Sequence, residues 1–227
     1  MGALPYKFPR TPHLHGSGAT RDDRVLSAEE TRRVLSLPLR VDEKVDGANL
    51  GIHFEAGEDA PSVQNRGHVL GRGEHAQYAP LWGWLTERQD RLRKHLGHKY
   101  VLYGEWLYAR HSVRYERLPS YFLAFDLLDK STGKFLDRET LRRVCDRCDV
   151  DVVYSAAVDH VFRTVQAVAS AVGISRFSHS ERAEGLYLRH EEAGFLVGRY
   201  KWVRPNFTAG ITEHWATRPI EKNGLLL

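Results

Sequence analysis

Short runs of alternating apolar and polar residues recur along the chain and predict β-strands. Residues 37–41 and 50–54 are two such runs, and they meet at a turn that contains Gly47. They are expected to form a hairpin that holds Lys44 on the rim of a sheet. Further strands are predicted at residues 62–67, 100–108, 121–128, 152–158, 184–189 and 195–204.

Helical spacing of apolar residues predicts helices between these strands. The first helix begins after Ser27, because Ser27 and Glu30 carry the signature of a capping box, and Pro38 limits its end. Further helices are predicted at residues 77–96, 137–147 and 161–171. Since helices and strands interleave irregularly, we expect an α+β fold with largely antiparallel sheets.

The chain of 227 residues is long enough to form one large domain. Residues 1–26, rich in Pro, Gly, His and Arg, are expected to form an N-terminal arm, residues 27–207 the main domain, and residues 208–227 a short tail. No apolar run approaches a membrane span, and the N-terminus lacks the apolar core of a secretory signal. These features predict a cytoplasmic protein that makes no contact with a membrane.

Charge and cysteine content add two expectations. Lys and Arg number 33 against 29 for Asp and Glu, an excess that favours a polyanionic partner such as nucleic acid. Cys145 and Cys148 lie in the amphipathic stretch 137–149, with no second pair or His pair to complete a zinc site. We therefore expect both to be reduced residues of a helix.

Polar residues that the strands do not need for folding lie at several strand ends. Lys44, Asp46 and Asn49 surround the Gly47 turn. The others are Arg66, Glu105, Asp126, Glu184, Arg189 and Lys201. Such a series predicts a site that lines a cleft between sheets. Only about one free lysine in a thousand is neutral near pH 7, and the neutral amine is the nucleophile. A lysine in such a site therefore reacts when burial or a neighbouring cation makes it lose its proton.

The order of these motifs resembles that of the ATP-dependent RNA ligases, covalent nucleotidyltransferases related to DNA ligases and mRNA capping enzymes. The matching motifs are Lys44 to Asn49 (K-x-D-G-x-N), Asn65-Arg66-Gly67, Tyr103-Gly104-Glu105, Phe125-Asp126, Glu184-Gly185 with Arg189, and Arg199-Tyr200-Lys201-Trp202-Val203-Arg204. The resemblance implies an ATP-grasp-like nucleotidyltransferase fold, with antiparallel sheets flanking an ATP cleft and helices at the periphery.

The resemblance also implies a reaction in three steps. Lys44 would attack the α-phosphorus of ATP and carry AMP, the AMP would pass to a 5′-phosphate end, and a 3′-hydroxyl would displace it to seal the strand. Mg²⁺ or Mn²⁺ would be required, held by Glu184, Glu105 and Asp46 or by their waters. Asp46 would alternatively orient the lysine. The metal and the Lys201 cation would drive the proton off Lys44.

Binding roles for the remaining residues follow from the same resemblance. Glu105 is alternatively an acceptor for the ribose hydroxyls. The residues expected around the nucleotide are Phe125 and Leu186 on the adenine faces, Glu43 at the adenine edge, Arg66 and Asn49 at the AMP phosphate or incoming 5′-phosphate, and Arg189, Arg199 and Lys201 at the triphosphate. The pair Lys201 and Arg204 is a rival to Arg199 and Lys201.

Other functions remain open at the level of sequence. The alternatives are a DNA ligase, a capping-type transferase, AMP transfer to an acceptor other than nucleic acid, and a non-enzymatic module that binds nucleic-acid ends. About 20 residues follow Arg204 in the sequence, fewer than an OB-fold domain needs. We therefore expect RNA ends or nicks as the substrate, gripped with help from the arm, a homodimer or a partner protein.

Overall fold

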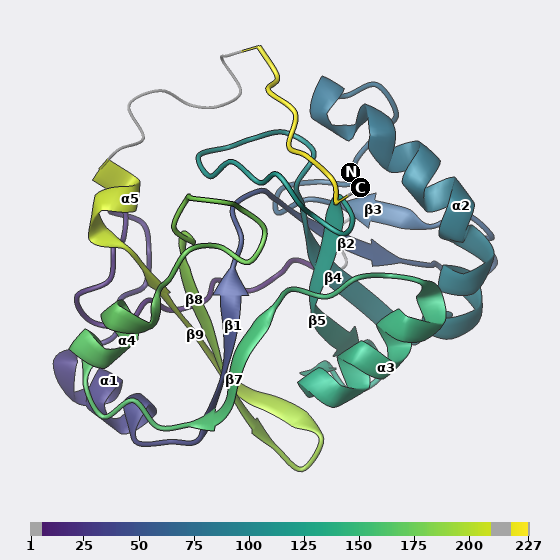
Figure 1. Ribbon diagram of the computed structural model, residues 1–227. Helices are drawn as coiled ribbons and strands as arrows, with labels where there is room; N and C mark the ends of the chain where they lie inside the picture. The colour runs from purple at the N-terminus through teal and green to yellow at the C-terminus, as the bar shows by residue number, and fades with distance from the viewer. Residues whose placement is uncertain (1–5, 210–218, 227) are drawn as a thin grey trace.

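Two antiparallel sheets form the centre of the protein, whose computed structural model describes residues 6–209 and 219–226 (Figure 1). Sheet A has the strand order β7-β1-β8-β9, with β1 Leu39–Lys44, β7 Ser155–His160, β8 Gly185–Glu192 and β9 Phe195–Val203. Sheet B has the order β3-β2-β4-β5-β6, with β2 Ala48–His53, β3 Ser62–Gln64, β4 Tyr100–Trp106, β5 Phe122–Asp129 and β6 Lys134–Phe135. The predicted α+β fold with antiparallel sheets is confirmed.

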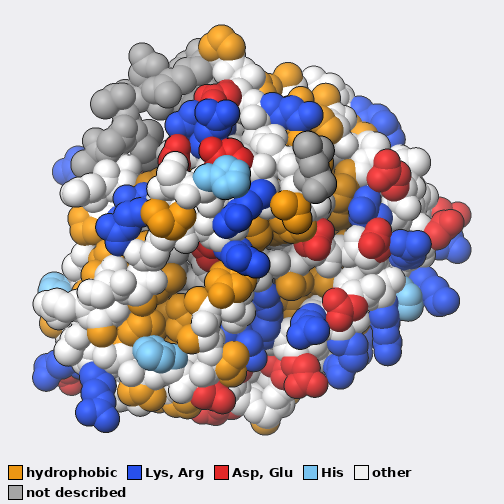
Figure 2. Space-filling model, in the orientation of Figure 1, with side chains coloured by type: hydrophobic (Ala, Val, Ile, Leu, Met, Phe, Trp, Pro, Cys, Tyr) orange, Lys and Arg blue, Asp and Glu red, His pale blue; other side chains and the backbone are white. Residues whose placement is uncertain are grey.

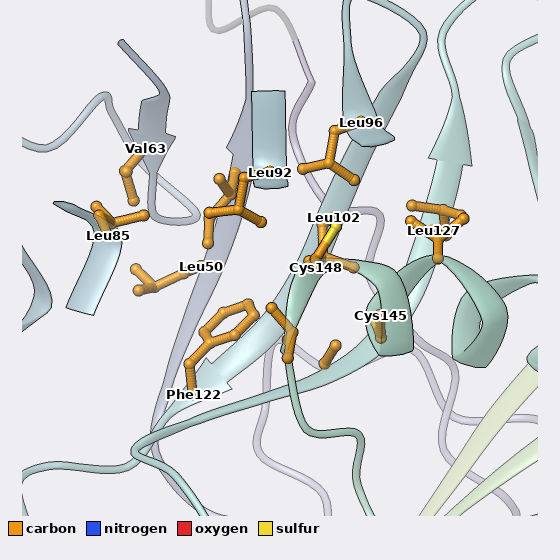
Figure 3. Close-up of a cluster of buried hydrophobic side chains, with 14 of the residues drawn as sticks. Leu50, Val63, Leu85, Leu92, Leu96, Leu102, Phe122, Leu127, Cys145 and Cys148 are labelled. Carbon is orange, nitrogen blue, oxygen red and sulfur yellow. The ribbon is translucent and has the colours of Figure 1, made fainter. Parts of the chain in front are cut away.

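One face of sheet B is covered by α2 (Ala79–Leu96) and α3 (Arg138–Cys148), preceded by the short helix η1 (Ala76–Tyr78). Figure 3 shows the core between them, in which leucines of α2 point toward apolar side chains of the strands. Cys145 and Cys148 lie in this core as free, buried residues, and burial raises the pKa of both thiols. They are thus core residues of a helix, as the sequence predicts.

Sheet A packs against α1 (Ala28–Leu35) and α4 (Val165–Ala171) through a second buried cluster. The capping box of α1 is present, since the Ser27 hydroxyl accepts from the Glu30 amide and the Glu30 carboxylate accepts from the Ser27 amide. The helix predicted from residue 161 begins only at Val165, because Thr164 is the N-cap and Arg163 has a positive φ of 63°. Among the described residues, no helix is long and apolar enough to cross a membrane.

The predicted hairpin around Gly47 is wrong. Strand β1 pairs with β7 and β8, whereas β2 pairs with β3 and β4, so the turn carries the chain from one sheet to the other. Gly47 is required at this crossing, because a Cβ there would lie 2.5 Å from the Trp106 carbonyl oxygen. The two alternating runs therefore place Lys44 at the junction of the sheets rather than on the rim of one.

The described parts of both terminal segments, residues 6–26 and 219–226, pack onto the main domain. In the N-terminal arm, His13 forms a parallel bridge with Lys201 of β9. After the short helix α5 (Pro205–Ala209), residues 210–218 of the expected tail lie outside the described part of the chain. Residues 219–226 return to the domain, where Lys222 and Leu225 form bridges with Ala109 and Leu118. The sequence alone did not predict this packing.

Candidate active site

Lys44 ends strand β1 and points toward the residue that precedes the neighbouring strand β8. Its Nζ atom lies 2.6 Å from Glu184 Oε2, because the register pairs Lys44 with Gly185 directly after Glu184. The Lys44 side chain is 23% exposed and that of Glu184 is 9% exposed. The pair is therefore largely withdrawn from solvent but still reachable.

Strand β4 brings a second carboxylate to the same place from sheet B. Glu105 pairs across the strands with Asn49, and its Oε1 atom accepts a hydrogen bond of 3.2 Å from the Gly47 amide. The turn between the sheets is thus tied to sheet B by Glu105, while Lys44 is tied to sheet A by Glu184. The candidate site spans the junction of the two sheets.

Asp46 is held by the loop that follows β4. Its Oδ2 atom accepts from the amides of Ser112 at 2.7 Å and Val113 at 3.3 Å, and its own amide donates to the Tyr115 hydroxyl at 2.8 Å. This arrangement orients the Lys44 turn and uses one of the two Asp46 carboxylate oxygens. Tyr115, which is fully buried, is a supporting residue that sequence reasoning missed.

Excess negative charge controls the electrostatics of the site. Burial lowers the pKa of Lys44, but Glu184, Glu105 and Asp46 outweigh it and raise that pKa overall. The pKa of Glu184 is raised to about 7, mainly by burial. The Lys44 ammonium lowers this pKa, whereas repulsion from the Asp46 and Glu105 carboxylates raises it. Without a metal, Glu184, Glu105 and Asp46 therefore favour the charged form of Lys44, and the expected removal of its proton by a metal and Lys201 together stays a prediction.

The same charge excess bears on metal binding. Among residues 6–209 and 219–226, no group of three His, Cys, Asp or Glu side chains has an arrangement that could hold a metal. The expected trio of Glu184, Glu105 and Asp46 is thus not a preformed set of direct ligands, and one oxygen of each already accepts a hydrogen bond from the protein. Their oxygens still fit a divalent cation that keeps several of its waters, and such a cation would relieve the crowding of negative charge.

Strand β9 contributes the basic residues, and its register shows how the two rival pairs lie. Arg199 and Lys201 are two residues apart and pair with Arg189 and Tyr187 of β8, so both lie on one face of sheet A. Arg204 lies beyond the strand, and its Nε atom donates to the Ala183 carbonyl at 2.7 Å. Arg199 also donates to the buried Asp126 carboxylate at 3.2 Å, so Lys201 is the residue common to both pairs, and the choice of its partner stays a prediction. Burial and the nearby Lys44 lower the pKa of Lys201.

The Arg189 guanidinium is bonded to partners within the protein. Its side chain is 0% exposed and its guanidinium donates to the Asp126 and Glu191 carboxylates. Further bonds reach the carbonyls of Phe125 at 2.8 Å and Leu136 at 3.3 Å. Through these bonds Arg189 of sheet A is linked to Asp126 and Phe125 of sheet B. The expected contact of Arg189 with a triphosphate is therefore wrong for this buried side chain.

Two residues expected around adenine have other partners. The Glu43 carboxylate accepts from the Ser175 hydroxyl at 2.5 Å and the Arg176 amide at 2.9 Å. Leu186 pairs with Glu43 and packs in the buried cluster of sheet A with Trp202. Since neighbouring residues of a strand point to opposite faces, both lie on the face opposite Lys44. The expected contacts of Glu43 and Leu186 with adenine beside Lys44 are therefore wrong.

Phe125 retains a place near the site. It is the extra residue of a β-bulge between β4 and β5, a feature that redirects a side chain out of the regular alternation. Its ring lies 5.3 Å from that of Phe8 in the arm and 6.1 Å from that of Tyr187, measured between centroids. The adenine contact of Phe125 stays a prediction, and Phe8 is a further neighbour that the sequence did not reveal.

The expected phosphate contacts of Arg66 and Asn49 also stay predictions. Arg66 is exposed in the loop after β3, close enough for its charge to act on Glu105 and Lys201. Asn49 is half-buried beside Glu105. Both therefore lie near the Lys44 junction.

Comparison with known proteins gives a family and a fold. The model of the RNA ligase family matches residues 37–203, whereas no curated protein sequence matches the chain. A point mutant of Naegleria gruberi RNA ligase with ATP and Mn superposes with a TM-score of 0.69 at 14% identity, covering 92% of this chain and 59% of that chain. The structure of the same ligase with PPi has a TM-score of 0.63 at 16% identity, covering 91% and 63%.

The two comparisons carry different weight. The solved structures are too distant in sequence to establish more than the fold, and this chain spans less than two thirds of their length. The family model, however, covers most of the chain and includes Lys44, Glu105, Glu184 and Lys201. On this basis the chain belongs to the RNA ligase family.

Proposed function

We propose that the protein is an ATP-dependent RNA ligase in which Lys44 forms a covalent bond to AMP. The observation that carries this proposal is the position of the Lys44 amine, 2.6 Å from Glu184 at the junction of the two sheets. Membership of the RNA ligase family supports the reaction class. The Naegleria gruberi ligase, with the same fold, has been solved with ATP and with AMP in the presence of Mn.

In the first step the Lys44 nitrogen bonds to the α-phosphorus of ATP, and the bond between that phosphorus and the pyrophosphate oxygen breaks. Lys44 must first lose a proton, for which the Glu184 carboxylate is the nearest acceptor, with a pKa of about 7. Mg²⁺ or Mn²⁺ bound through these carboxylates would supply the positive charge that favours the neutral amine. Lys201 and Arg66 provide fixed positive charge for the phosphate oxygens.

In the later steps AMP moves from Lys44 to the 5′-phosphate of a nucleic acid, and a 3′-hydroxyl displaces AMP to join the two ends. Asn49 and Arg66 lie near the lysine for the incoming phosphate. In Figure 2, Lys and Arg side chains gather along the middle of the face shown, with Asp and Glu beside them. We propose RNA as the substrate on the basis of the family, with a partner protein or second copy aiding its capture.

Mass spectrometry of the purified protein after incubation with ATP and Mg²⁺ tests this proposal. We expect a gain of one AMP on Lys44, no gain with GTP, and none in Lys44→Ala. Glu184→Ala and Lys201→Ala should each slow adenylylation by about 100-fold, as expected when a preorganised charge is removed. The exposed Lys94 of α2 is the matched control, and Lys94→Ala should adenylylate like the wild type.

Two results would count against the proposal. AMP on Lys44→Ala would show that another residue is the nucleophile. Full activity of Glu184→Ala would show that the contact with Lys44 is not part of the reaction. Sealing is tested separately with RNA carrying a 5′-phosphate and a 3′-hydroxyl, and with DNA of the same sequence, which distinguishes an RNA ligase from a DNA ligase.

A further inference from the structure

We propose that Asp23, in the N-terminal arm, is a positioning residue that fixes the Lys201 ammonium beside Lys44. The inference rests on the proposed function and adds to it a residue outside the family motifs. The family model begins at residue 37, so the arm is not part of the segment that it matches. The reason to include the arm is its direct contact with Lys201.

The backbone of the arm is bonded to the backbone of Lys201 on both sides. The Lys201 amide donates to the Pro12 carbonyl at 2.9 Å, and the Lys201 carbonyl accepts from the Leu14 amide at 3.0 Å. Leu14 is 0% exposed and anchors this stretch in the core of sheet A. The arm therefore runs as an added strand segment along β9 at the position of the lysine.

The side chain of Lys201 is fixed by the same arm. Its Nζ atom lies 3.2 Å from Asp23 Oδ1, with 15% of the Lys201 side chain and 25% of the Asp23 side chain exposed. The other Asp23 oxygen accepts from the Thr20 amide at 2.9 Å and the Thr20 hydroxyl at 2.7 Å. The turn from Thr20 to Asp23 thus fixes the orientation of the Asp23 carboxylate that pairs with Lys201.

His13 closes the arrangement from the buried side. Its imidazole is 2% exposed, with Nδ1 2.8 Å from the Ser17 hydroxyl and Nε2 3.3 Å from Asp23 Oδ1. The contact of Nε2 with Asp23 does not meet the geometry of a hydrogen bond, so the imidazole packs against the carboxylate without bonding to it. Ser17 is in turn bonded to the Val203 amide at 2.8 Å, so the group is tied back to β9.

Lys201 needs such a partner because its surroundings are unfavourable to a localised ammonium. Lys44 and Arg66 repel it, and its four-carbon stem allows many rotamers. Asp23 is the carboxylate with which Lys201 forms an ion pair in the described part of the chain. A fixed Lys201 charge serves the transition state more than ATP binding, since orientation affects the reacting geometry most strongly.

The test compares Asp23→Asn, Asp23→Glu and Asp22→Asn in single-turnover adenylylation over a range of ATP concentrations. Asp23→Asn keeps the size of the side chain and its acceptor for Thr20 but removes the charge. We expect its maximal rate to fall between about 10-fold and 100-fold, with a half-saturating ATP concentration within about 3-fold of the wild type. Asp23→Glu should recover most of the rate. Asp22 is exposed, so Asp22→Asn should match the wild type.

A second readout does not require ligase activity. Trace labelling with acetic anhydride, read by mass spectrometry, reports how freely each lysine amine reacts. Relative to Lys94 in the same molecule, Lys201 should be labelled several-fold faster in Asp23→Asn than in the wild type. The thermal unfolding midpoint of the Asp23→Asn protein shows that this variant is folded.

The outcomes separate this inference from the proposed function. Unchanged labelling of Lys201 in folded Asp23→Asn, or an unchanged adenylylation rate, would overturn the positioning role. Loss of activity in both Asp23→Asn and Asp23→Glu without a change in labelling would indicate a structural role and also overturn it. Absence of adenylate in the wild type would refute the proposed function, and labelling would still decide whether Asp23 fixes Lys201.

Discussion

At the scale of single residues, His13 shows how burial makes stability depend on pH. Burial and the nearby Lys201 lower its pKa from 6.5 to about 4. In the unfolded chain the imidazole takes up a proton near its ordinary pKa, whereas in the folded protein it stays neutral until about pH 4. His13 therefore contributes stability above about pH 6.5 that is lost progressively as the pH falls through this window.

Replacing His13 with Gln is expected to remove that contribution. The free energy of unfolding of the wild type, relative to His13→Gln, should decrease from pH 7.5 to pH 4.5 by at most about 3 kcal/mol. Urea denaturation at both pH values measures it, and the difference between the proteins cancels titration elsewhere. His15 is exposed two residues away, so His15→Gln should keep the wild-type dependence. Equal slopes for His13→Gln and the wild type would contradict the prediction.

At the scale of elements, local patterns predicted the strands and helices but not all of their partners. The capping box at Ser27 and the alternation in β8 depend on residues a few positions apart, so they can be recognised directly. The pairing of β1 with β8 joins residues more than 140 positions apart, and nothing local distinguishes it from a hairpin with β2. The error about the hairpin followed from this difference.

The same limit explains the errors in the candidate site. Motif order identified Lys44, Glu184 and Glu105, which the structure brings together. It did not show which strand face meets the cleft, so Leu186 was expected at adenine although it alternates with Tyr187 and points into a core. Nor did it show that Arg189 is 0% exposed, because a buried partner such as Asp126 is known only from the packing of the two sheets.

The C-terminal segment 219–226 is another element whose role the sequence did not reveal. Asn223 is 1% exposed, and its side chain accepts from the Tyr115 amide at 3.0 Å and donates to the Leu107 carbonyl at 2.8 Å. Tyr115 in turn accepts from the Asp46 amide beside the nucleophile. The segment thus fastens the loop that orients the Lys44 turn.

Asn223→Ala is expected to weaken both the fold and the reaction. It leaves a buried amide and a buried carbonyl without partners, which should lower the free energy of unfolding by about 1–3 kcal/mol. Adenylylation of Lys44 should slow as the Asp46 loop loosens. Urea denaturation and the adenylylation assay measure the two effects. Leu226→Ala is the control, because this side chain is 66% exposed in the same segment, and equal results for both variants would refute the role of Asn223.

At the scale of the whole molecule, a buried ionic cluster joins the two sheets below the site. Asp126 of β5 accepts from Arg189 and, at 3.2 Å, from Arg199, both on sheet A. The Tyr187 hydroxyl donates to the same carboxylate at 2.8 Å. Lys44 is bonded to Glu184 beside sheet A, and the turn that follows Lys44 is bonded to Glu105 of sheet B. The relative position of the two sheets therefore sets the geometry of the site.

Asp126→Asn should therefore destabilise the protein strongly, although it preserves the size of the side chain. Removing one partner of a buried ion pair leaves the other charge uncompensated and costs about 3–5 kcal/mol. Arg189 has no exposed surface through which water could replace Asp126, and Glu191 would be the carboxylate left in an ion pair with it among the described residues. Urea denaturation measures the loss. Asp146→Asn breaks an exposed pair with Arg142 on α3 and should cost less than about 0.5 kcal/mol. If the two variants lost similar stability, Asp126 would not be the joint between the sheets.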